Sequence, residues 1–322
     1  MQIRPFRYDT VDYERYVTLY NSIISDKPAS LEFERRQDEE WPEGQLRERV
    51  LVLDEEGDAQ AAADYNHLPW SFHPNKFGFM IFVRQDVRRR GLGTALFNYM
   101  LEALAPYEPQ ILESATREDW PEGLRFLEKR GFQTVNREQS SELDPANFDA
   151  SRFAPLLASV AASGLQIKSL REVMDTDPDT LRKLCDLENE LAPDIPWYDD
   201  PTPQSFEDWV KGYEDNPDLL PDGYFIALDG TNFAGVSHLW GSQASDRILY
   251  TGFTGVRRPY RKRGVATALK VHAIEYARNL TSADGQPVKI VTSNEQNNLM
   301  LQINLHLGFQ EQPAWLIYVL EL

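Results

Sequence analysis

The stretch that decides the fold reads Tyr260-Arg261-Lys262-Arg263-Gly264-Val265-Ala266-Thr267-Ala268-Leu269. An apolar run, 248–256, precedes it, and a helical pattern of apolar residues follows it. A strand, a basic glycine turn and a helix together predict an anion site. The first amides of a helix are unpaired, and the aligned peptide dipoles place roughly half a positive charge at that end. Glycine lets the backbone approach the anion closely, and the flanking arginines add charged donors.

The same pattern occurs a second time, nearer the start of the chain. Residues 88–96 read Arg88-Arg89-Arg90-Gly91-Leu92-Gly93-Thr94-Ala95-Leu96, again after an apolar run, at 77–83. In both halves a later short helical pattern ends in Gly-Phe, at 131–132 and 308–309. Two matches in the same context indicate an internal duplication. We therefore expect two domains, 1–148 and 164–322, joined by a linker helix at 149–163.

Composition and charge limit the class of protein. The chain has 322 residues, which is long enough for two domains. Its net charge of −18 argues against a protein that binds nucleic-acid phosphates and suits cationic partners. The single cysteine, Cys185, excludes an internal disulfide and indicates a reducing compartment. We see no signal peptide, membrane span or metal-ligand spacing, so we expect a cytoplasmic protein without membrane contact or metal.

The two halves repeat one order of elements. Each has an opening strand, an amphipathic helix, an acidic and aromatic segment, a hairpin, the strand–turn–helix unit, another strand and a short helix. The expected ranges are 2–4, 32–43, 50–53 with 59–65 and 110–114 in the first half, and 166–168, 194–222, 224–228 with 233–239 and 288–292 in the second. Neither turn continues into the Gly-Lys-Ser/Thr of a P-loop, and the third glycine of a dinucleotide-binding fingerprint is absent.

With this order of elements, each half resembles the GNAT acetyltransferase superfamily, and the whole chain resembles a tandem GNAT protein, the arrangement also found in mycothiol synthase. The resemblance implies an α+β fold, with a mixed, mostly antiparallel sheet flanked by helices in each domain. It also implies that acetyl-CoA binds in a split between two central strands. Such a chain could be a monomer with pseudo-dimeric domains or a homodimer.

The resemblance assigns cofactor contacts residue by residue. The glycine turns match the loop that holds the diphosphate, the ends of the preceding strands match the backbone that pairs with the pantetheine arm, and Asn294 and Asn297 match the far edge of the site. The full set is Ile81, Val83, Arg88, Arg89, Arg90, Gly91, Leu92, Gly93 and Thr94 in the first half, and Thr254, Gly255, Val256, Arg261, Lys262, Arg263, Gly264, Val265, Ala266, Thr267, Asn294 and Asn297 in the second. The first half has no matching asparagine after its later strand, so we expect the chemistry in the second half. The first half could bind acetyl-CoA without turnover or be purely structural.

The catalytic groups depart from the family pattern. Many members place a tyrosine four residues before the Gly-Phe glycine, where it can protonate the leaving thiolate, but this chain has Leu127 and Asn304 there. Asn304 can donate a hydrogen bond but cannot act as an acid. Some members use a glutamate where this chain has Tyr250, and His238 on the neighbouring strand is a further candidate base. A structural, hydrogen-bonded histidine is the alternative for His238.

These observations favour an acetyl-CoA-dependent N-acetyltransferase acting on the primary amine of a small acceptor. The acidic charge favours a cationic acceptor, and Glu188, Glu190 and Asp194 border the expected acceptor side. The aromatic residues from Trp197 to Tyr213 could form a cation-selective lid or could simply pack. A small amine, an amino sugar, an aminoacyl compound and a peptide terminus all remain open as acceptors. The alternative is a catalytically silent acyl-CoA-binding or interaction protein.

Overall fold

The structure is a computed structural model of the chain, and it describes residues 2–196, 198–213 and 216–322. The chain divides into two compact units: unit 1 contains Met1–Asn136 and Trp315–Leu322, and unit 2 contains Arg137–Ala314. Each unit therefore includes a strand from the other half of the sequence. The expected division at 148 and 164 follows the duplicated sequence, whereas the compact units follow the sheet pairing.

Unit 1 contains one sheet with helices on both faces. Its elements are β1 (Ile3–Pro5), α1 (Thr10–Ile23), α2 (Leu31–Glu39), β2 (Arg47–Leu53), β3 (Ala59–Asn66), β4 (Lys76–Val83), α3 (Leu92–Leu104), β5 (Ile111–Arg117), α4 (Pro121–Glu128) and β13 (Trp315–Glu321). The strand order is β1-β2-β3-β4-β5-β13. All neighbours are antiparallel except β4 and β5, which are parallel.

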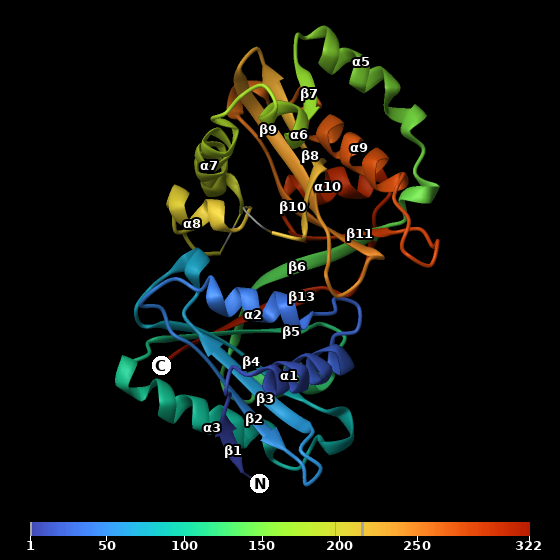
Figure 1. Cartoon of the computed structure of the whole chain (residues 1–322). Helices are drawn as coiled ribbons and strands as arrows, with labels where there is room; N and C mark the ends of the chain where they lie inside the picture. Colours follow the sequence, from blue (N-terminus) through green and yellow to red (C-terminus); the bar gives the residue numbers. More distant parts are fainter. Residues whose placement is uncertain (1, 197, 214–215) are drawn as a thin grey trace. The chain divides into compact units, whose positions relative to one another are not determined.

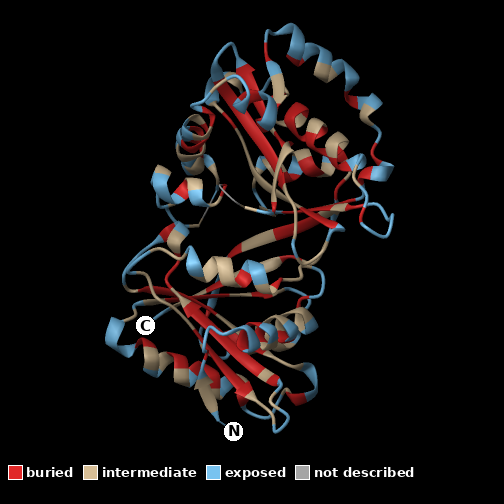
Figure 2. Ribbon diagram, viewed as in Figure 1, coloured by how far each residue is buried: buried red, intermediate tan, exposed pale blue. Residues whose placement is uncertain are grey.

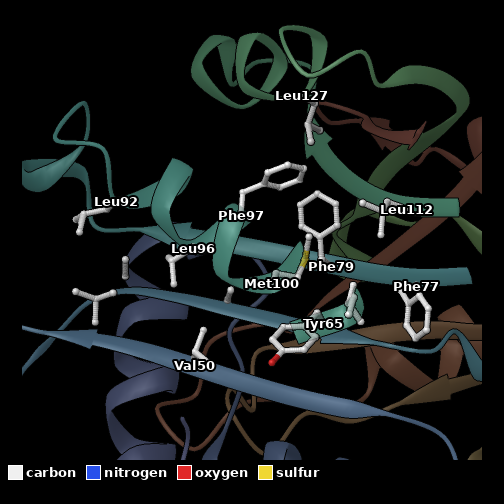
Figure 3. Packing of buried hydrophobic residues seen from close by; sticks show 14 of the residues in the cluster. Val50, Tyr65, Phe77, Phe79, Leu92, Leu96, Phe97, Met100, Leu112 and Leu127 are labelled. Atoms are coloured by element: carbon white, nitrogen blue, oxygen red, sulfur yellow. The ribbon is translucent and has the colours of Figure 1, made fainter. Parts of the chain in front are cut away.

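Alternation along the strands of unit 1 builds two cores. Val50 and Val52 pack with α3, whereas Leu51, between them, packs with α1 on the other face. This is the period-two pattern of a strand buried on both faces. Figure 3 shows the α3 side, where Phe79 and Phe97 face each other in the packed interior. The hydrophobic periodicity thus places α3 on one face and α1 on the other.

A buried charge cluster lies between α2 and the β2–β3 pair. Arg49 on β2 has no exposed surface, and its guanidinium bonds the carboxylates of Glu34 and Asp38 on α2 and, at 2.8 Å, of Asp64 on β3. Arg47 adds an ion pair to Asp38 at 3.0 Å. Because each carboxylate is held by a buried arginine, removing Arg49 would leave three acidic groups without their main partner.

Unit 2 repeats this plan with its own set of elements. They are α5 (Ala154–Ala162), β7 (Gln166–Ser169), α6 (Leu170–Met174), α7 (Thr180–Leu191), α8 (Phe206–Lys211), β8 (Leu219–Asp229), β9 (Asn232–Trp240), β10 (Ile248–Val256), α9 (Val265–Arg278), β11 (Lys289–Glu295), α10 (Leu299–Leu307) and β12 (Gln310–Glu311). The strand β6 (Gln133–Leu143) joins this sheet through its pairing with β11. The order is β6-β11-β10-β9-β8-β7, and β12 pairs with β6.

Two helical layers cover the sheet of unit 2. Figure 1 shows α7 and α8 on one side of β8–β10 and α9 on the other, in agreement with separate apolar clusters on the two faces. Buried residues concentrate along the central strands (Figure 2). The expected mixed, mostly antiparallel sheet with flanking helices is confirmed in both units. The strands after each Gly-Phe, β6 and β13, are additions that the sequence patterns did not predict.

Candidate active site

A cleft opens in unit 2 where two central strands separate. β10 and β11 pair in parallel only from Ile248–Lys289 to Tyr250–Val291, although β10 continues to Val256 and β11 to Glu295. Beyond that point residues 251–256 and 292–295 line a cleft of about 1040 Å³, together with the first turns of α9 and the start of α10. On its other edge β10 remains paired, since Thr254, Gly255 and Val256 pair with β9. The cleft edge of β10 therefore presents its backbone groups to a ligand.

The turn before α9 forms one end of the cleft. Lys262 and Gly264 both have left-handed backbone, with φ of 59° and 78°. Alternating backbone of this kind turns successive amides toward one point and makes an anion-binding concavity. Gly264 caps α9 with no side-chain hydrogen bond, so the first amides of the helix, from Val265 to Thr267, have no side-chain cap. The sequence prediction of a glycine-shaped helix start is matched here by the backbone angles.

The arginines of this turn already have internal partners. Arg261 Nε donates to the Val256 carbonyl at 2.7 Å, and the rest of its guanidinium pairs with Asp194. Arg258 also donates to Asp194, at 2.7 Å. Hydrogen bonds from Arg258 and Arg261 lower the pKa of Asp194 to about 2. Asp194 is thus paired with Arg261, the arginine that we expect to bind a phosphate.

Most of the predicted contacts of the second half meet in this one cleft. The residues that line it are Thr254, Gly255, Val256, Arg261, Lys262, Gly264, Val265, Ala266, Thr267, Asn294 and Asn297. Arg263 is not among them, and its guanidinium lies 5.8 Å from the centre of the Tyr260 ring. Asn297 bonds the Glu295 carboxylate through its backbone and side-chain nitrogens, at 2.7 and 2.9 Å.

A β-bulge interrupts β10 beside the cleft. The pairing with β9 shifts by one residue between Thr251 and Thr254, so Gly252 and Phe253 both lie opposite His238. A Cβ on Gly252 would lie 1.8 Å from His238 Nε2, so only glycine fits at this position. The Phe253 amide donates to His238 Nε2 at 3.0 Å. The bulge therefore depends on a glycine and on a histidine acceptor.

These contacts argue against His238 as the catalytic base. Its Nε2 lone pair already accepts the Phe253 amide, and the side chain is 2% exposed. Burial, with a smaller effect from the charge of Lys270, lowers the pKa of His238 to about 3. A neutral imidazole with its acceptor nitrogen occupied is a structural group, which was the alternative interpretation of this residue. Tyr250 precedes the bulge on β10, and neither Tyr250 nor His238 lines the cleft within the described part of the chain.

Asn304 lies beneath the far side of the cleft. Its side chain is fully buried on α10, and Nδ2 donates to Asn294 Oδ1 at 2.6 Å. Asn304 Oδ1 has no hydrogen-bond partner. Asn304 therefore orients Asn294, which lines the cleft, and its own amide hydrogen is engaged. This contact explains an asparagine here better than an acid role does.

The acidic residues on the α7 side are also engaged internally. The buried Glu188 carboxylate accepts hydrogen bonds from Trp209 Nε1 at 2.8 Å, Tyr224 at 2.8 Å and Tyr213 at 3.1 Å. Burial raises the pKa of Glu188, and these three donors oppose the shift. Trp209 stacks on Tyr213 with ring centres 3.9 Å apart, in the core of this face. These two aromatic residues pack, as the alternative reading of the segment held, and Trp197 lies outside the described residues.

Unit 1 has the same turn but a filled interior. Arg89 and Gly91 repeat the left-handed pair, with φ of 65° and 87°. Behind the turn, Phe97 on α3 packs edge-on against Phe79, Phe126 and Phe132, with ring centres 5.6 to 6.2 Å apart. Ile81, Val83 and Leu92 belong to or pack against the same core. At the positions aligned with the cleft residues Lys270 and Ile303, unit 1 thus has the packed rings of Phe97 and Phe126.

Helix α4 also ties down the turn of unit 1. Arg88 donates to Glu122 at 3.0 Å, and Arg130 donates to Thr94 at 2.9 Å. A Cβ on Gly93 would lie 3.2 Å from the Phe126 ring, which shows how closely the ring covers the start of α3. Arg90 donates to the Asp86 carbonyl at 3.3 Å. Arg88, Arg90 and Thr94, which we predicted to contact the cofactor, thus have hydrogen-bond partners within unit 1.

The comparisons with known proteins agree with this geometry. The model of the acetyltransferase (GNAT) family matches residues 16–132 and 181–300, and the chain belongs to this family. A tandem GNAT protein from the clavulanic acid biosynthesis pathway is similar over 99% of this chain and 98% of its own, with a TM-score of 0.73 and 16% identity. A GCN5-related N-acetyltransferase from Sphaerobacter thermophilus covers 99% and 95%, with a TM-score of 0.68 and 19% identity. These likenesses show the fold, with two GNAT domains in tandem. A search of the curated proteins found no match.

Two further properties were searched for among the described residues. None of the helices there combines the length and apolar character needed to cross a bilayer. No group of three or more His, Cys, Asp or Glu side chains is placed there to hold a metal ion.

Sequence reasoning missed several residues of the cleft, and Lys270 is the most unusual of them. Lys270 on α9 lines it and is 3% exposed. The signal was available: when the halves are aligned on Gly91 and Gly264, Lys270 falls at the position of Phe97. A lysine on the buried face of an otherwise apolar helix is unusual.

Proposed function

We propose that the chain is an acetyl-CoA-dependent N-acetyltransferase that acts on the primary amine of a small, cationic acceptor, and that its acyl-CoA site is the cleft of unit 2. Membership of the acetyltransferase family supports acyl transfer in general. The observation that carries the site is the separation of β10 from β11 directly before an uncapped, basic helix start.

The residues present fit a CoA thioester. Its diphosphate needs amide and cationic donors, which the start of α9 supplies with Arg261 and Lys262. Its pantetheine arm carries amides, which can pair with the open edge of β10 from Thr254 to Val256 in the manner of an added strand. When bound, the thioester supplies an activated acyl carbonyl.

Placing the site in unit 2 follows from the interior of unit 1. Phe97 and Phe126 correspond to Lys270 and Ile303 when the halves are aligned on their two glycines. Both residues of unit 2 line the cleft, whereas the two rings of unit 1 pack against each other. We take these packed rings to disfavour an extended arm in unit 1, although β4 and β5 also separate beyond Gly78 and Glu113. We therefore assign unit 1 a structural role.

The cationic preference of the acceptor depends on the net charge of −18. Of the carboxylates expected to border the acceptor, Glu188 is held by three donors, Glu190 by Arg257 at 2.9 Å, and Asp194 by two arginines. Long-range attraction of a cation depends on the electric field of all the charges of the protein together, so ion pairing of these carboxylates does not remove the attraction. The acceptor amine would lose its proton to water or to Tyr250, since His238 is engaged.

A second candidate is a catalytically silent acyl-CoA-binding or interaction protein. It is favoured by one observation, the absence of Tyr250 and His238 from the lining of the cleft. A silent binder predicts stabilisation by CoA esters without turnover, and indifference of all measured properties to Tyr250→Phe.

One experiment separates the two. The protein is incubated with acetyl-CoA and a panel of amines while free thiol is measured, and thermal unfolding is followed with and without acetyl-CoA. The enzyme predicts thiol release above the water rate with at least one amine. It also predicts that Arg261→Gln raises the KM for acetyl-CoA about tenfold, whereas the matched Arg88→Gln leaves it unchanged. Stabilisation without any thiol release would favour the silent binder. If acetyl-CoA causes neither stabilisation nor thiol release, both hypotheses are rejected.

A further inference from the structure

Lys270 is a buried amine without a partner in the cleft. It lies on α9 and is 3% exposed, and its side chain lines the cleft between β10 and β11. Among the described residues its ammonium makes no hydrogen bond or ion pair, and it lies 5.9 Å from the centre of the Phe309 ring. Its helical neighbours Leu269 and Val271 are buried and apolar. An isolated ammonium in such surroundings is strongly disfavoured.

The fold itself does not require a lysine at this position. Unit 1 has Phe97 at the aligned place, fully packed among three other rings. An apolar side chain therefore satisfies the same helix against the same kind of sheet. A group that breaks the local rule of burial without a structural gain indicates a functional site.

Three carboxylates line the cleft, those of Glu138, Asp194 and Glu295, and among the described residues none of them forms an ion pair with Lys270. Asp194 bonds Arg258 and Arg261, and Glu295 bonds Asn297. The electron-rich partner of the ammonium must then come from the ligand.

Position along the helix selects the part of the ligand. Lys270 is six residues beyond Gly264, which corresponds to roughly 9 Å along α9 from the turn that meets the diphosphate. It therefore lies beside the arm and away from the diphosphate. Asn304 is not in the lining of the cleft, and its side chain donates to Asn294. Lys270 is thus the charged donor placed deep in the cleft.

Resting on the proposed function, we propose that the Lys270 ammonium contacts the sulfur of the bound thioester and gives it a proton when the acyl group leaves. The amine nitrogen forms a bond to the acyl carbon, the carbon–sulfur bond breaks, and its electron pair stays on sulfur. The proton moves from Lys270 Nζ to sulfur, and the second proton of the acceptor nitrogen, which leaves after the attack, restores the ammonium through solvent; the first proton has left before the attack. Burial lowers the pKa of Lys270 to about 7, below the roughly 8.5 of an ordinary thiol, so transfer of the proton to a thiolate is favourable.

The test compares two ligands that differ only at sulfur. Binding of CoA and of desulfo-CoA to the full chain is measured by calorimetry at pH 6, where Lys270 is protonated, for the natural protein, Lys270→Met and Lys262→Met. The natural protein should bind CoA about tenfold or more tightly than desulfo-CoA, because a charged contact to sulfur is lost in the analogue. Lys270→Met should bind the two equally. Lys262→Met, at the mouth of the cleft, should weaken both by the same factor.

Three outcomes would overturn the inference. If the CoA to desulfo-CoA ratio is the same in the natural protein and in Lys270→Met, the lysine does not contact sulfur, while the proposed acyl-CoA site stands. If Lys270→Met instead removes a preference for succinyl-CoA over butyryl-CoA, the lysine binds an acyl carboxylate. If neither CoA nor desulfo-CoA binds the natural protein, the proposed function fails together with the inference.

Discussion

Replacing Lys270 by methionine should stabilise the protein in the absence of ligand. Methionine has nearly the length of lysine, can fill the same space, and buries no charge. The lysine is unpaired and 3% exposed, and its burial lowers its pKa from 10.5 to about 7. The folded state therefore binds this proton less well than the unfolded chain does. Lys270 destabilises the fold wherever the unfolded chain is protonated.

The size of the effect depends on pH in a defined direction. The destabilisation is absent above pH 10.5, grows as the pH falls, and is complete below pH 7, where the shift corresponds to ~5 kcal/mol at about 1.36 kcal/mol per unit. With half of the folded protein protonated at pH 7, the difference is about 4 kcal/mol. At pH 9.5 it is about 1 kcal/mol. Stability of the natural protein relative to Lys270→Met should thus rise by about 3 kcal/mol between these two values.

The assay is equilibrium unfolding in urea at pH 7.0 and pH 9.5, followed by circular dichroism, with the transition of unit 2 compared between variants. The exposed Lys262→Met is the matched control and should change the free energy of unfolding by less than about 0.5 kcal/mol at both values. A less stable Lys270→Met at pH 7.0, or a difference that does not depend on pH, would show that Lys270 has a stabilising partner and would refute the reasoning.

Three further changes test other parts of the structure. Arg49→Met should lower the free energy of unfolding by about 3–5 kcal/mol, because it leaves Glu34, Asp38 and Asp64 without their buried partner. The exposed Arg7→Met is the control and should change stability little. Thermal unfolding measures both variants, and equal effects would contradict a stabilising role of the buried charge cluster. Asp194→Asn should tighten CoA binding about threefold to tenfold, because it releases Arg261 to bind the diphosphate. Glu190→Gln, which removes a carboxylate paired with Arg257, is the control and should leave CoA binding unchanged. Calorimetry that shows weaker binding by Asp194→Asn would contradict the role of Arg261 in binding CoA. Gly252→Ala should destabilise the protein by about 1–3 kcal/mol and weaken CoA binding, because its Cβ would collide with His238. In the control Gly241→Ala, the nearest neighbour of the new Cβ lies at 3.5 Å, so this change should be tolerated. If Gly252→Ala keeps its stability and its CoA affinity, the bulge does not require glycine.

The parts of the fold that the sequence predicted are those with local signals. The alternation of Val50, Leu51 and Val52 indicates a strand buried on both faces, and the structure places these residues in two different cores. Glycine at positions 91 and 264 predicts left-handed backbone there, because few other residues adopt it freely, and both glycines have positive φ in the structure. Duplicated order then extends each local prediction to the other half.

Pairing between distant segments left no such signal. β13 joins β5, and β6 joins β11, so each unit is completed by a strand from the other half of the sequence. The bulge at Gly252 depends on the position of His238 on a neighbouring strand, which sequence spacing does not give. Sequence spacing alone therefore leaves both roles open for His238, a base or a structural acceptor. Lys270 was overlooked because its oddity appears only when it is compared with Phe97 in the other half.

The central claim is that the cleft of unit 2, and not the filled interior of unit 1, receives acyl-CoA. Hydrogen–deuterium exchange with and without acetyl-CoA tests it most directly, because the amides that should bind the ligand are named. We predict slower exchange in 252–267 and 292–300, including the uncapped amides of Val265 and Thr267, and no change in 81–94. Protection at 81–94, or at neither segment, would contradict the account.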